Sequence, residues 1–501
     1  MSLDLFHKLR HHADHRPDRP ALRVLGPAAA DHPTVTWRSL YHQTAAAAAR
    51  LDRTLPPGAT IMLVSGNRPA LVPAFLAVLA TGRTVFPLDA SLTAAEVSRL
   101  AERTDPRGLL IDPVLAPRFA PLGLPLFDLG PLTTPPLGPG FADAPDPAFA
   151  ERSQDAWLWL QSSGTTGGPK IVRRSGPSLD AVARNVAQTV GLGLDDQVVA
   201  AVPLSHSYGI ENGMLAPLWA GAGALHPLPD LAQPGRGFDP RLAVSPGATV
   251  LPGVPAMFEM IDRLDLGPGN LRLAYSAGGP LPPELADRLR NRQHLPLGQL
   301  YGTTEVGSVA YSPHPDTVGR PMPGVELRIL DPQHPDPDRP LPPGRIGHVA
   351  VRAPSMFAGY LEPADPPEAP PAFSAGFFLT GDLGQLNADG RLSLTGRLKL
   401  LIDVGGVKVN PLEVERALAA YPDIAECVVV PDPVSPTINR VRALITPVDP
   451  AATLDERTLR AFLRTRLAPH KIPRAFEFRA TLPKSATGKI LRQQLLPRAS
   501  A

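Results

Sequence analysis

The sequence is poor in several residue types, and each shortage narrows what the chain can be. Its 501 residues include one cysteine, Cys427, which excludes a disulfide framework and a metal site built on cysteines. The net charge of +2 gives no electrostatic basis for binding nucleic acid or an acidic membrane. Residues 1–20 are polar and no apolar run reaches about 18 residues, so neither a signal peptide nor a membrane span is expected. The expected location is the cytoplasm.

Lysine is also scarce, with seven residues against 42 arginines. A sequence with this bias tends to keep lysine where a compact, flexible ammonium is needed. Five of the seven lie in or beside glycine-containing segments, namely Lys170, Lys399, Lys408, Lys484 and Lys489. For Lys408, chance clustering near the C-terminus stays an alternative.

What is present indicates a large α/β protein. The length predicts more than one domain, and 43% hydrophobic and 19% charged residues are typical of a globular chain. Apolar strands alternate with helices to about residue 300, which indicates a largely parallel sheet. The first of these elements are expected as helices at 3–15, 37–51 and 70–80 and as strands at 59–65 and 84–87. Proline-rich residues 113–147 and 362–371 are expected to be connections without regular structure.

The second part of the chain has a different pattern. Alternating apolar residues at 325–330 and 348–352 predict half-buried strands. A smaller unit is expected from about Gly396 onward. Its expected elements are a helix at 411–421, strands at 426–430 and 441–446, a helix at 454–467 and then a basic tail.

Residues 162–170 carry the strongest chemical signal. Glycines allow backbone N–H groups to converge on an anion, hydroxyls such as Ser162, Thr165 and Thr166 add donors, and Lys170 adds a mobile positive charge. This composition predicts a phosphate-binding loop. It is not the Walker type, because Ile171 stands where the magnesium-binding Ser or Thr would follow the lysine.

Further glycine-containing segments follow in order, at residues 301–305, 378–382, 396–399, 405–415 and 483–489. Each alone could be a turn, a helix cap or a solvated tail. Together with the loop at 162–170, with Asn67 and with residues 203–209, 276–280 and 318–321, they resemble the adenylate-forming superfamily. That superfamily contains acyl-CoA synthetases, 4-coumarate:CoA ligases, firefly luciferases and the adenylation domains of peptide synthetases.

The resemblance implies a fold and a domain organisation. We expect a large N-terminal domain with several sheets and flanking helices over 1–396, and a small, mobile α+β domain over 397–501. The hinge is expected near Lys399. After adenylation the small domain would rotate, withdraw Lys489 and bring Gly405 and Gly406, expected beside a thiol tunnel, toward the active site. This domain closure would also exclude water from the labile acyl-adenylate.

The resemblance also implies a reaction, in which ATP activates a carboxylic acid as an acyl-adenylate and a thiol, most commonly that of coenzyme A, then accepts the acyl group. Cations and dipoles aimed at the phosphate oxygens are the main catalytic device for the first step. The catalytic residues implied are Lys489, which bridges the carboxylate and the α-phosphate, Thr304, Glu305 as the Mg²⁺ ligand, and His206 as a gate.

The remaining roles implied by the resemblance concern the nucleotide and the acyl group. The nucleotide-binding residues are Ser162, Thr165, Thr166, Lys170, Gly278, Gly279, Pro280, Tyr301, Asp382 and Arg397, with Tyr301 stacking on adenine and Asp382 accepting from the ribose. Tyr208 and Asn212 are expected to line or back the acyl pocket. Glu211 either does the same or faces away and supports the fold. Ser207 stands where peptide-synthetase domains carry an aspartate, which disfavours an α-amino acid. Glu211 and Asn212 are more polar than a fatty-acid tunnel would want, which favours a short or aryl acid with a polar substituent.

Two departures from the commoner residues of the superfamily leave the identity of the acyl acceptor open. Val404 and Val407 remove polar groups beside the expected thiol tunnel, and Lys408 either attracts a CoA phosphate or is an exposed strand residue. A second hypothesis is therefore an adenylating enzyme that passes its acyl group to an amine or to a carrier protein acting in trans, since only twelve residues follow Lys489. A third is a nucleotide-binding protein without catalysis, against which the pair Glu305 and Lys489 argues.

Overall fold

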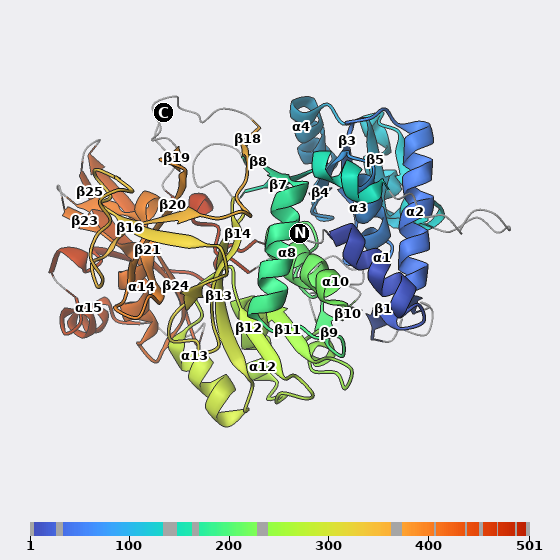
Figure 1. The fold of residues 1–501 in the computed structure, drawn as a ribbon. Coiled ribbons are helices and arrows are strands. Elements are labelled where there is room, and N and C mark those ends of the chain that lie inside the picture. The colour runs from blue at the N-terminus through green and yellow to red at the C-terminus, as the bar shows by residue number, and fades with distance from the viewer. Residues whose placement is uncertain are drawn as a thin grey trace. The chain divides into compact units, whose positions relative to one another are not determined.

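A computed structural model describes residues 5–26, 34–133, 148–162, 170–227, 239–361, 373–404, 407–435, 438–449, 454–467, 469–485 and 488–496 (Figure 1). By its internal contacts the chain divides into two compact units. Unit 1 comprises Met1–Glu326 and Arg352–Pro370, and unit 2 comprises Leu327–Val351 and Pro371–Ala501. The predicted domain boundary at 396/397 falls within unit 2, and it stays a prediction because a division by contacts does not report which part moves.

Unit 1 contains two sheets. The larger has nine strands in the order β15 (Arg320–Pro321), β14 (Gly307–Ser312), β13 (Leu297–Thr303), β12 (Leu273–Ser276), β11 (Val250–Gly253), β9 (Gln197–Val199), β10 (Gly223–Pro227), β1 (Pro20–Leu25) and β2 (Val35–Thr36). The smaller has seven strands in the order β18 (Gly359–Tyr360), β8 (Ile171–Ser175), β7 (Trp157–Gln161), β4 (Thr84–Leu88), β3 (Thr60–Val64), β5 (Gly108–Ile111) and β6 (Leu126–Asp128).

Both sheets are parallel at their centres, as the sequence predicts. Strands β13, β12, β11, β9, β10 and β1 run parallel, as do β7, β4, β3, β5 and β6, and the antiparallel strands lie toward the edges. Parallel strands are covered on both faces, and β4 and β5 are accordingly buried along their whole length.

Helices cover these sheets. Those of unit 1 are α1 (Leu5–His15), α2 (Trp37–Thr54), α3 (Leu71–Ala80), α4 (Ala94–Thr104), α5 (Ala116–Phe119), α6 (Leu129–Thr133), α7 (Phe149–Arg152), α8 (Gly176–Thr189), α9 (Ser207–Ile210), α10 (Ala216–Ala220), α11 (Pro240–Ala243), α12 (Pro255–Arg263) and α13 (Pro283–Asp287). Helix α3 is apolar all round and every residue in it is buried. Helix α8 packs against the nine-stranded sheet through Val182 and Val186, beside Tyr275 of β12 (Figure 1).

Unit 2 contains three small sheets and two α-helices in its described residues. Strands β16 (Glu326–Leu330), β17 (Gly347–Arg352), β20 (Phe377–Leu386), β19 (Phe373–Ser374) and β21 (Leu392–Arg397) form the first sheet, and β22 (Ile402–Val404) and β23 (Val407–Val409) form the second. The third comprises β24 (Ile424–Ser435), β25 (Ile438–Pro447) and β26 (Ala475–Phe478), with α14 (Pro411–Ala419) and α15 (Glu456–Arg464) beside it.

Two expectations about local structure are wrong. The proline-rich segment from 113 is not irregular, because α5, β6 and α6 all form before residue 134. The expected basic tail after α15 contains strand β26, which pairs in parallel with β25 from Arg442↔Ala475 to Ile445↔Phe478. Strand β26 has only four residues and charged neighbours, so its local sequence gives little indication of a strand. It forms because the edge of β25 is available for pairing.

Candidate active site

The predicted site residues of unit 1 lie where parallel strands end. Ser162 follows β7, Gly278 follows β12, and Thr304 follows β13. Ligands in open α/β sheets bind at the carboxyl ends of the strands, because the chain there leaves the sheet as loops. The two sheets therefore present their predicted residues on the edge where such sites form.

Asn67 joins the carboxyl edges of the two sheets. It follows β3, and its Nδ2 donates to the carbonyls of Ala200 and Val202 at 2.7 and 2.8 Å, beyond the end of β9. Its Oδ1 accepts from the N–H of Leu204 at 2.8 Å, and its own carbonyl lies 3.0 Å from Nδ1 of His226. The side chain therefore fixes the backbone that leads to His206.

Lys170 and Glu305 are brought together by Tyr360. The Tyr360 hydroxyl donates to Glu305 Oε1 at 3.0 Å, and Lys170 Nζ lies 4.6 Å from the centroid of the Tyr360 ring. Burial and the neighbouring Glu305 carboxylate raise the pKa of Tyr360, so its hydroxyl keeps the proton that it donates. The N–H of Phe357 also donates to the Glu305 carbonyl at 2.7 Å. Sequence reasoning missed Tyr360, which lies 55 residues from Glu305 and belongs to no predicted motif.

Glu305 fits a magnesium ion that is also held by phosphate. Magnesium prefers hard oxygen ligands and commonly takes one or two carboxylates together with substrate phosphates and water. Across the described ranges, no group of three or more His, Cys, Asp or Glu could hold a metal. A single partly buried carboxylate near Lys170, which is predicted to bind phosphate, suits that mode of binding.

The predicted adenine-binding segment has an open backbone at the edge of the nine-stranded sheet. Gly278 has φ +83°, a conformation that favours glycine, and a Cβ at this position would have Val254 as its nearest neighbour at 3.7 Å. Gly279 and Pro280 continue the same turn, and Tyr301 lies on the adjacent strand β13. Tyr301 is largely buried, so its stacking on adenine stays a prediction.

The predicted acyl-pocket residues lie around the helical segment that begins after His206. His206 is exposed, which rules out a core histidine. The Tyr208 hydroxyl donates to the carbonyl of Tyr275 at 3.2 Å. Asn212 is buried, donates to Tyr208 O and Ser308 Oγ at 3.2 Å each, and accepts from the Tyr275 hydroxyl at 3.1 Å. These bonds suit a side chain that backs the pocket wall, and direct contact with an acyl group remains a prediction for both residues.

Glu211 is buried and paired, which favours the alternative in which it supports the fold. It begins a π-helical turn, Glu211–Leu215, between α9 and α10. Its carboxylate pairs with Arg174 at 3.1 Å, and both side chains are almost wholly buried. Burial raises the pKa of Glu211, while Arg174 and Ser308 act in the opposite direction. Sequence reasoning did not identify Arg174.

In unit 2, Asp382 and Arg397 face each other across β20 and β21. They are register partners, and Arg397 Nε donates to Asp382 Oδ1 at 2.7 Å. Gly381 at φ +77° makes the preceding bend, which His348 Nε2 holds by accepting the Gly381 N–H at 2.8 Å. Burial lowers the pKa of His348, which keeps this nitrogen free to accept.

Lys489 lies within the electrostatic reach of the same two residues. Loss of hydration at the ammonium and the positive charge of Arg397 lower the pKa of Lys489, and Asp382 opposes the shift. Backbone bonds hold the position: Ser485 N–H donates to the Lys489 carbonyl at 2.8 Å, and Lys489 N–H donates to Ser485 Oγ at 3.2 Å. Unit 2 therefore gathers three predicted site residues.

Some predicted residues are not tested by these contacts. Thr165, Thr166, Gly405 and Gly406 lie outside the described residues. Lys399 lies in a short 3₁₀ turn, Leu398–Leu400, immediately after β21. Its role as a hinge stays a prediction.

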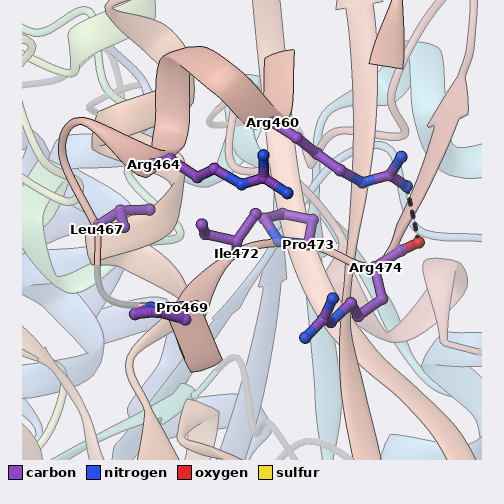
Figure 2. A pocket seen from close by; sticks show the side chains of 7 residues that line it. All are labelled: Arg460, Arg464, Leu467, Pro469, Ile472, Pro473 and Arg474. Atoms are coloured by element: carbon purple, nitrogen blue, oxygen red, sulfur yellow. Dashed lines mark hydrogen bonds between the residues drawn. The ribbon is translucent and has the colours of Figure 1, made fainter. Parts of the chain in front are cut away.

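A basic cavity in unit 2 was not predicted. It has a volume of about 370 Å³ and lies between the end of α15 and the start of β26. Figure 2 shows Arg460, Arg464 and Arg474 around it, with an apolar floor that includes Ile472. Arg460 Nη2 donates to the Arg474 carbonyl at 2.9 Å. Neither the Arg464 nor the Arg474 side chain forms an ion pair with any described residue, so two guanidinium groups remain available to an anion.

Comparison with known proteins covers nearly the whole chain. Residues 9–361 match the model of the AMP-binding enzyme family, and residues 413–489 match the AMP-binding enzyme C-terminal domain. An oxalate–CoA ligase of Arabidopsis thaliana is 30% identical over 95% of both chains, and a sulfoacetate–CoA ligase of Cupriavidus necator is 29% identical over 88% of both. The structure of ATP-bound MatB from Rhodopseudomonas palustris superimposes with a TM-score of 0.82 at 26% identity, covering 99% of this chain and 98% of that one. Within the described residues, no helix has both the length and the apolar character needed to cross a bilayer.

Proposed function

The chain belongs to the AMP-binding enzyme family, and we propose that it is an acid:CoA ligase that forms an acyl-adenylate from ATP and a carboxylic acid. The observation that carries the proposal is the contact of Tyr360 with both Glu305 and Lys170. It links a predicted phosphate-binding lysine to a predicted magnesium-binding carboxylate, and both would act on the same triphosphate.

In the first half-reaction a carboxylate oxygen of the acid forms a bond to the α-phosphorus of ATP, and the bond from that phosphorus to the pyrophosphate oxygen breaks. Lys170 and the Thr304 hydroxyl would stabilise the negative charge on the phosphates. A magnesium ion at Glu305 would supply further charge neutralisation. Tyr360 would keep the Glu305 carboxylate oriented toward that ion.

Residues of unit 2 would complete this step. Asp382 would accept hydrogen bonds from the ribose hydroxyls, and Arg397 holds that carboxylate in place. The Lys489 ammonium has three donors, so it can bond to the acid and to the α-phosphate at the same time.

In the second half-reaction the thiol sulfur bonds to the acyl carbon, AMP leaves with the bonding electrons, and the thiol loses its proton. We propose coenzyme A as the thiol, because the basic cavity of unit 2 offers Arg464 and Arg474 to a polyphosphate. The oxalate and sulfoacetate in the names of two relatives each carry a second acidic group. Acids with a second polar group, including short ones, are therefore the substrates to examine first. The cytoplasmic location stays a prediction.

A pyrophosphate-release assay with a panel of acids, run with and without coenzyme A, tests the proposal. The panel should include oxalate, sulfoacetate, other short diacids and aryl acids. We expect release of pyrophosphate and AMP, multiple turnovers only with coenzyme A, and an acyl-CoA product by mass spectrometry. Release of inorganic phosphate and ADP would contradict the adenylation step.

Two other results would favour the alternatives. Turnover with a phosphopantetheinylated carrier protein or an amine, but not with coenzyme A, would change the acceptor and keep the adenylation. ATP binding without pyrophosphate release for any acid would indicate a nucleotide-binding protein.

A further inference from the structure

The Arg174–Glu211 pair is buried beside the candidate site. The sequence left the role of Glu211 open and did not identify Arg174. Arg174 lies in β8, four residues after Lys170, and its side chain is 0% exposed against 2% for Glu211. Removing two charges from water costs free energy that their attraction does not always recover, and packed apolar residues can often replace such a pair. Stability alone therefore does not explain why charged residues occupy these positions. The hydrogen bonds that the two side chains make indicate what else they do.

Those hydrogen bonds converge on the turn that carries Thr304 and Glu305. At one end of the turn, Arg174 Nη1, which also bonds Glu211 Oε1, makes a longer contact of 3.4 Å to the carbonyl of Thr304. At the other end, Glu211 Oε2 accepts from the N–H of Ser308 at 3.0 Å and from its hydroxyl at 3.2 Å. One ion pair thus holds both ends of a five-residue segment.

Gly307 shows how closely the turn fits against the carboxylate. Its φ is +82°, and a Cβ there would lie 2.6 Å from Glu211 Oε1. A residue with a side chain would be strained by the backbone conformation and would push against Glu211. The turn therefore approaches Glu211 through its only glycine.

Strand β8 also supports the turn through its neighbour β18. β8 pairs with β18 at Arg173↔Gly359 and Val172↔Tyr360. Tyr360 of β18 donates to the Glu305 side chain, and Phe357 just before β18 donates to the Glu305 backbone. The strand that follows Lys170 is therefore linked to the turn twice, to Glu305 through β18 and to Thr304 through Arg174.

We infer that Arg174 and Glu211 are positioning residues, which set the Thr304–Glu305 turn relative to Lys170 and so align the phosphates and magnesium for adenylation. This inference rests on the proposed function. Because both side chains are buried in the protein, neither is expected to touch the nucleotide. Apolar packing has no preferred direction, whereas a guanidinium and a carboxylate fix the angles of the groups they bond, which explains why charges occupy these sites.

The test is the double variant R174M/E211Q. It removes both charges together, and the amide oxygen that E211Q introduces still accepts from Ser308, so no buried charge is left without its partner. We expect a folded protein by circular dichroism, a fall of about tenfold or more in kcat for pyrophosphate release, and a higher magnesium concentration at half-maximal rate. The KM for the acid should not change. R174K, which retains one donor for Glu211, should lie between the double variant and the parent.

R83M is the matched control. Arg83 is another buried arginine of unit 1, paired with Asp52 at 2.6 Å. It precedes the amino end of β4, whereas the predicted site residues follow the carboxyl ends of strands. R83M should lose stability without losing activity per folded molecule. If R174M/E211Q does not fold, S308A and R174K are measured in the same assays, because each weakens one bond to the pair.

Unchanged kcat and magnesium dependence in folded R174M/E211Q would overturn the inference. A change confined to the KM for the acid would also overturn it and would make the pair part of the acyl pocket. Pyrophosphate release by the parent protein depends on the proposed function but not on this inference. Measuring it in the parent therefore shows which of the two has failed. If the parent releases none, calorimetric affinity for Mg·ATP is the readout, and equal affinity in parent and variant counts against the inference.

Discussion

The hydroxyl of Tyr360 donates to the carboxylate of Glu305 at 3.0 Å, across a separation of 55 residues. The same ring lies beneath the ammonium of Lys170, at 4.6 Å. A hydrogen bond orients the carboxylate and a cation–π contact places the lysine, so one side chain serves two different predicted motifs. The two contacts can be removed separately.

Tyr360→Phe removes the hydroxyl and keeps the ring. A hydrogen bond to a charged group contributes about 1.5–3 kcal/mol when buried, and about 1 kcal/mol is expected here because Glu305 is partly exposed. The KM for Mg·ATP should therefore rise about fivefold in steady-state pyrophosphate release. Tyr360→Ala also removes the contact with Lys170 and should raise the KM for Mg·ATP further. Equal kinetics for Phe, Ala and Tyr at this position would show that neither contact matters.

Lys489→Ala should abolish formation of the adenylate and spare thioester formation from a supplied acyl-adenylate. The ammonium is needed only while the acid bonds to phosphorus, so the two half-reactions separate in single-turnover measurements. Lys484→Ala is the control, because that lysine lies in the same segment and pairs with Glu426. Loss of both half-reactions in the Lys489 variant would contradict a role confined to adenylation.

The rate of adenylation should also depend on the charge of Lys489. Loss of hydration and the charge of Arg397 lower its pKa. A lysine is protonated below its pKa, so the rate should fall with rising pH at a lower pH than an ordinary lysine would give. In Lys489→Arg any remaining activity should lack this alkaline limb, since a guanidinium stays charged. The pH profile of pyrophosphate release, measured at saturating ATP, distinguishes these results.

Replacing Arg464 and Arg474 by Gln should weaken coenzyme A binding and leave adenylation intact. Their guanidinium groups line the basic cavity, and loss of two charge-assisted contacts at an exposed site should raise the KM for coenzyme A about tenfold. Arg457→Gln is the control, because Arg457 lies on the same helix but outside the cavity. Unchanged affinity for coenzyme A in the double variant would exclude this cavity as the phosphate site.

Acid should destabilise unit 1 through His226. Burial lowers the pKa of this histidine from 6.5 to about 4, and its ring bonds the carbonyl of Asn67 at 3.0 Å. Below pH 6.5 the histidine binds a proton in the unfolded chain but not in the folded protein. Its contribution to the free energy of unfolding is therefore fully present above pH 6.5 and is lost as the pH falls from 6.5 to about 4. At about 1.4 kcal/mol per pH unit the whole loss is about 3 kcal/mol.

His226→Asn keeps a donor for the Asn67 carbonyl and removes the titration. Urea denaturation at a series of pH values should therefore show a smaller loss for the variant. His12 has a pKa lowered to about 4 for the same reason, so some loss should persist. A variant as acid-sensitive as the parent would show that His226 is not responsible.

The sequence could single out the segments of the candidate site because each segment is local, and the roles of their residues stay predictions. The turn at 304–305 and the bend at Gly381 each depend on glycines and neighbouring polar residues within a few positions. Strand β26 and helix α5 could not be predicted so well, since short segments of mixed polarity form regular structure only against a particular neighbour.

The sequence by itself determined which chemical groups stand at the ends of the strands, because backbone preferences and the alternation of apolar residues act between near neighbours in the chain. Only the tertiary structure decided which distant groups meet. Arg174 and Glu211 are 37 residues apart, and Asn67 bonds a carbonyl 133 residues away. A buried polar group must bond to whatever the packed elements bring beside it, and that choice depends on the arrangement of elements and not on local sequence.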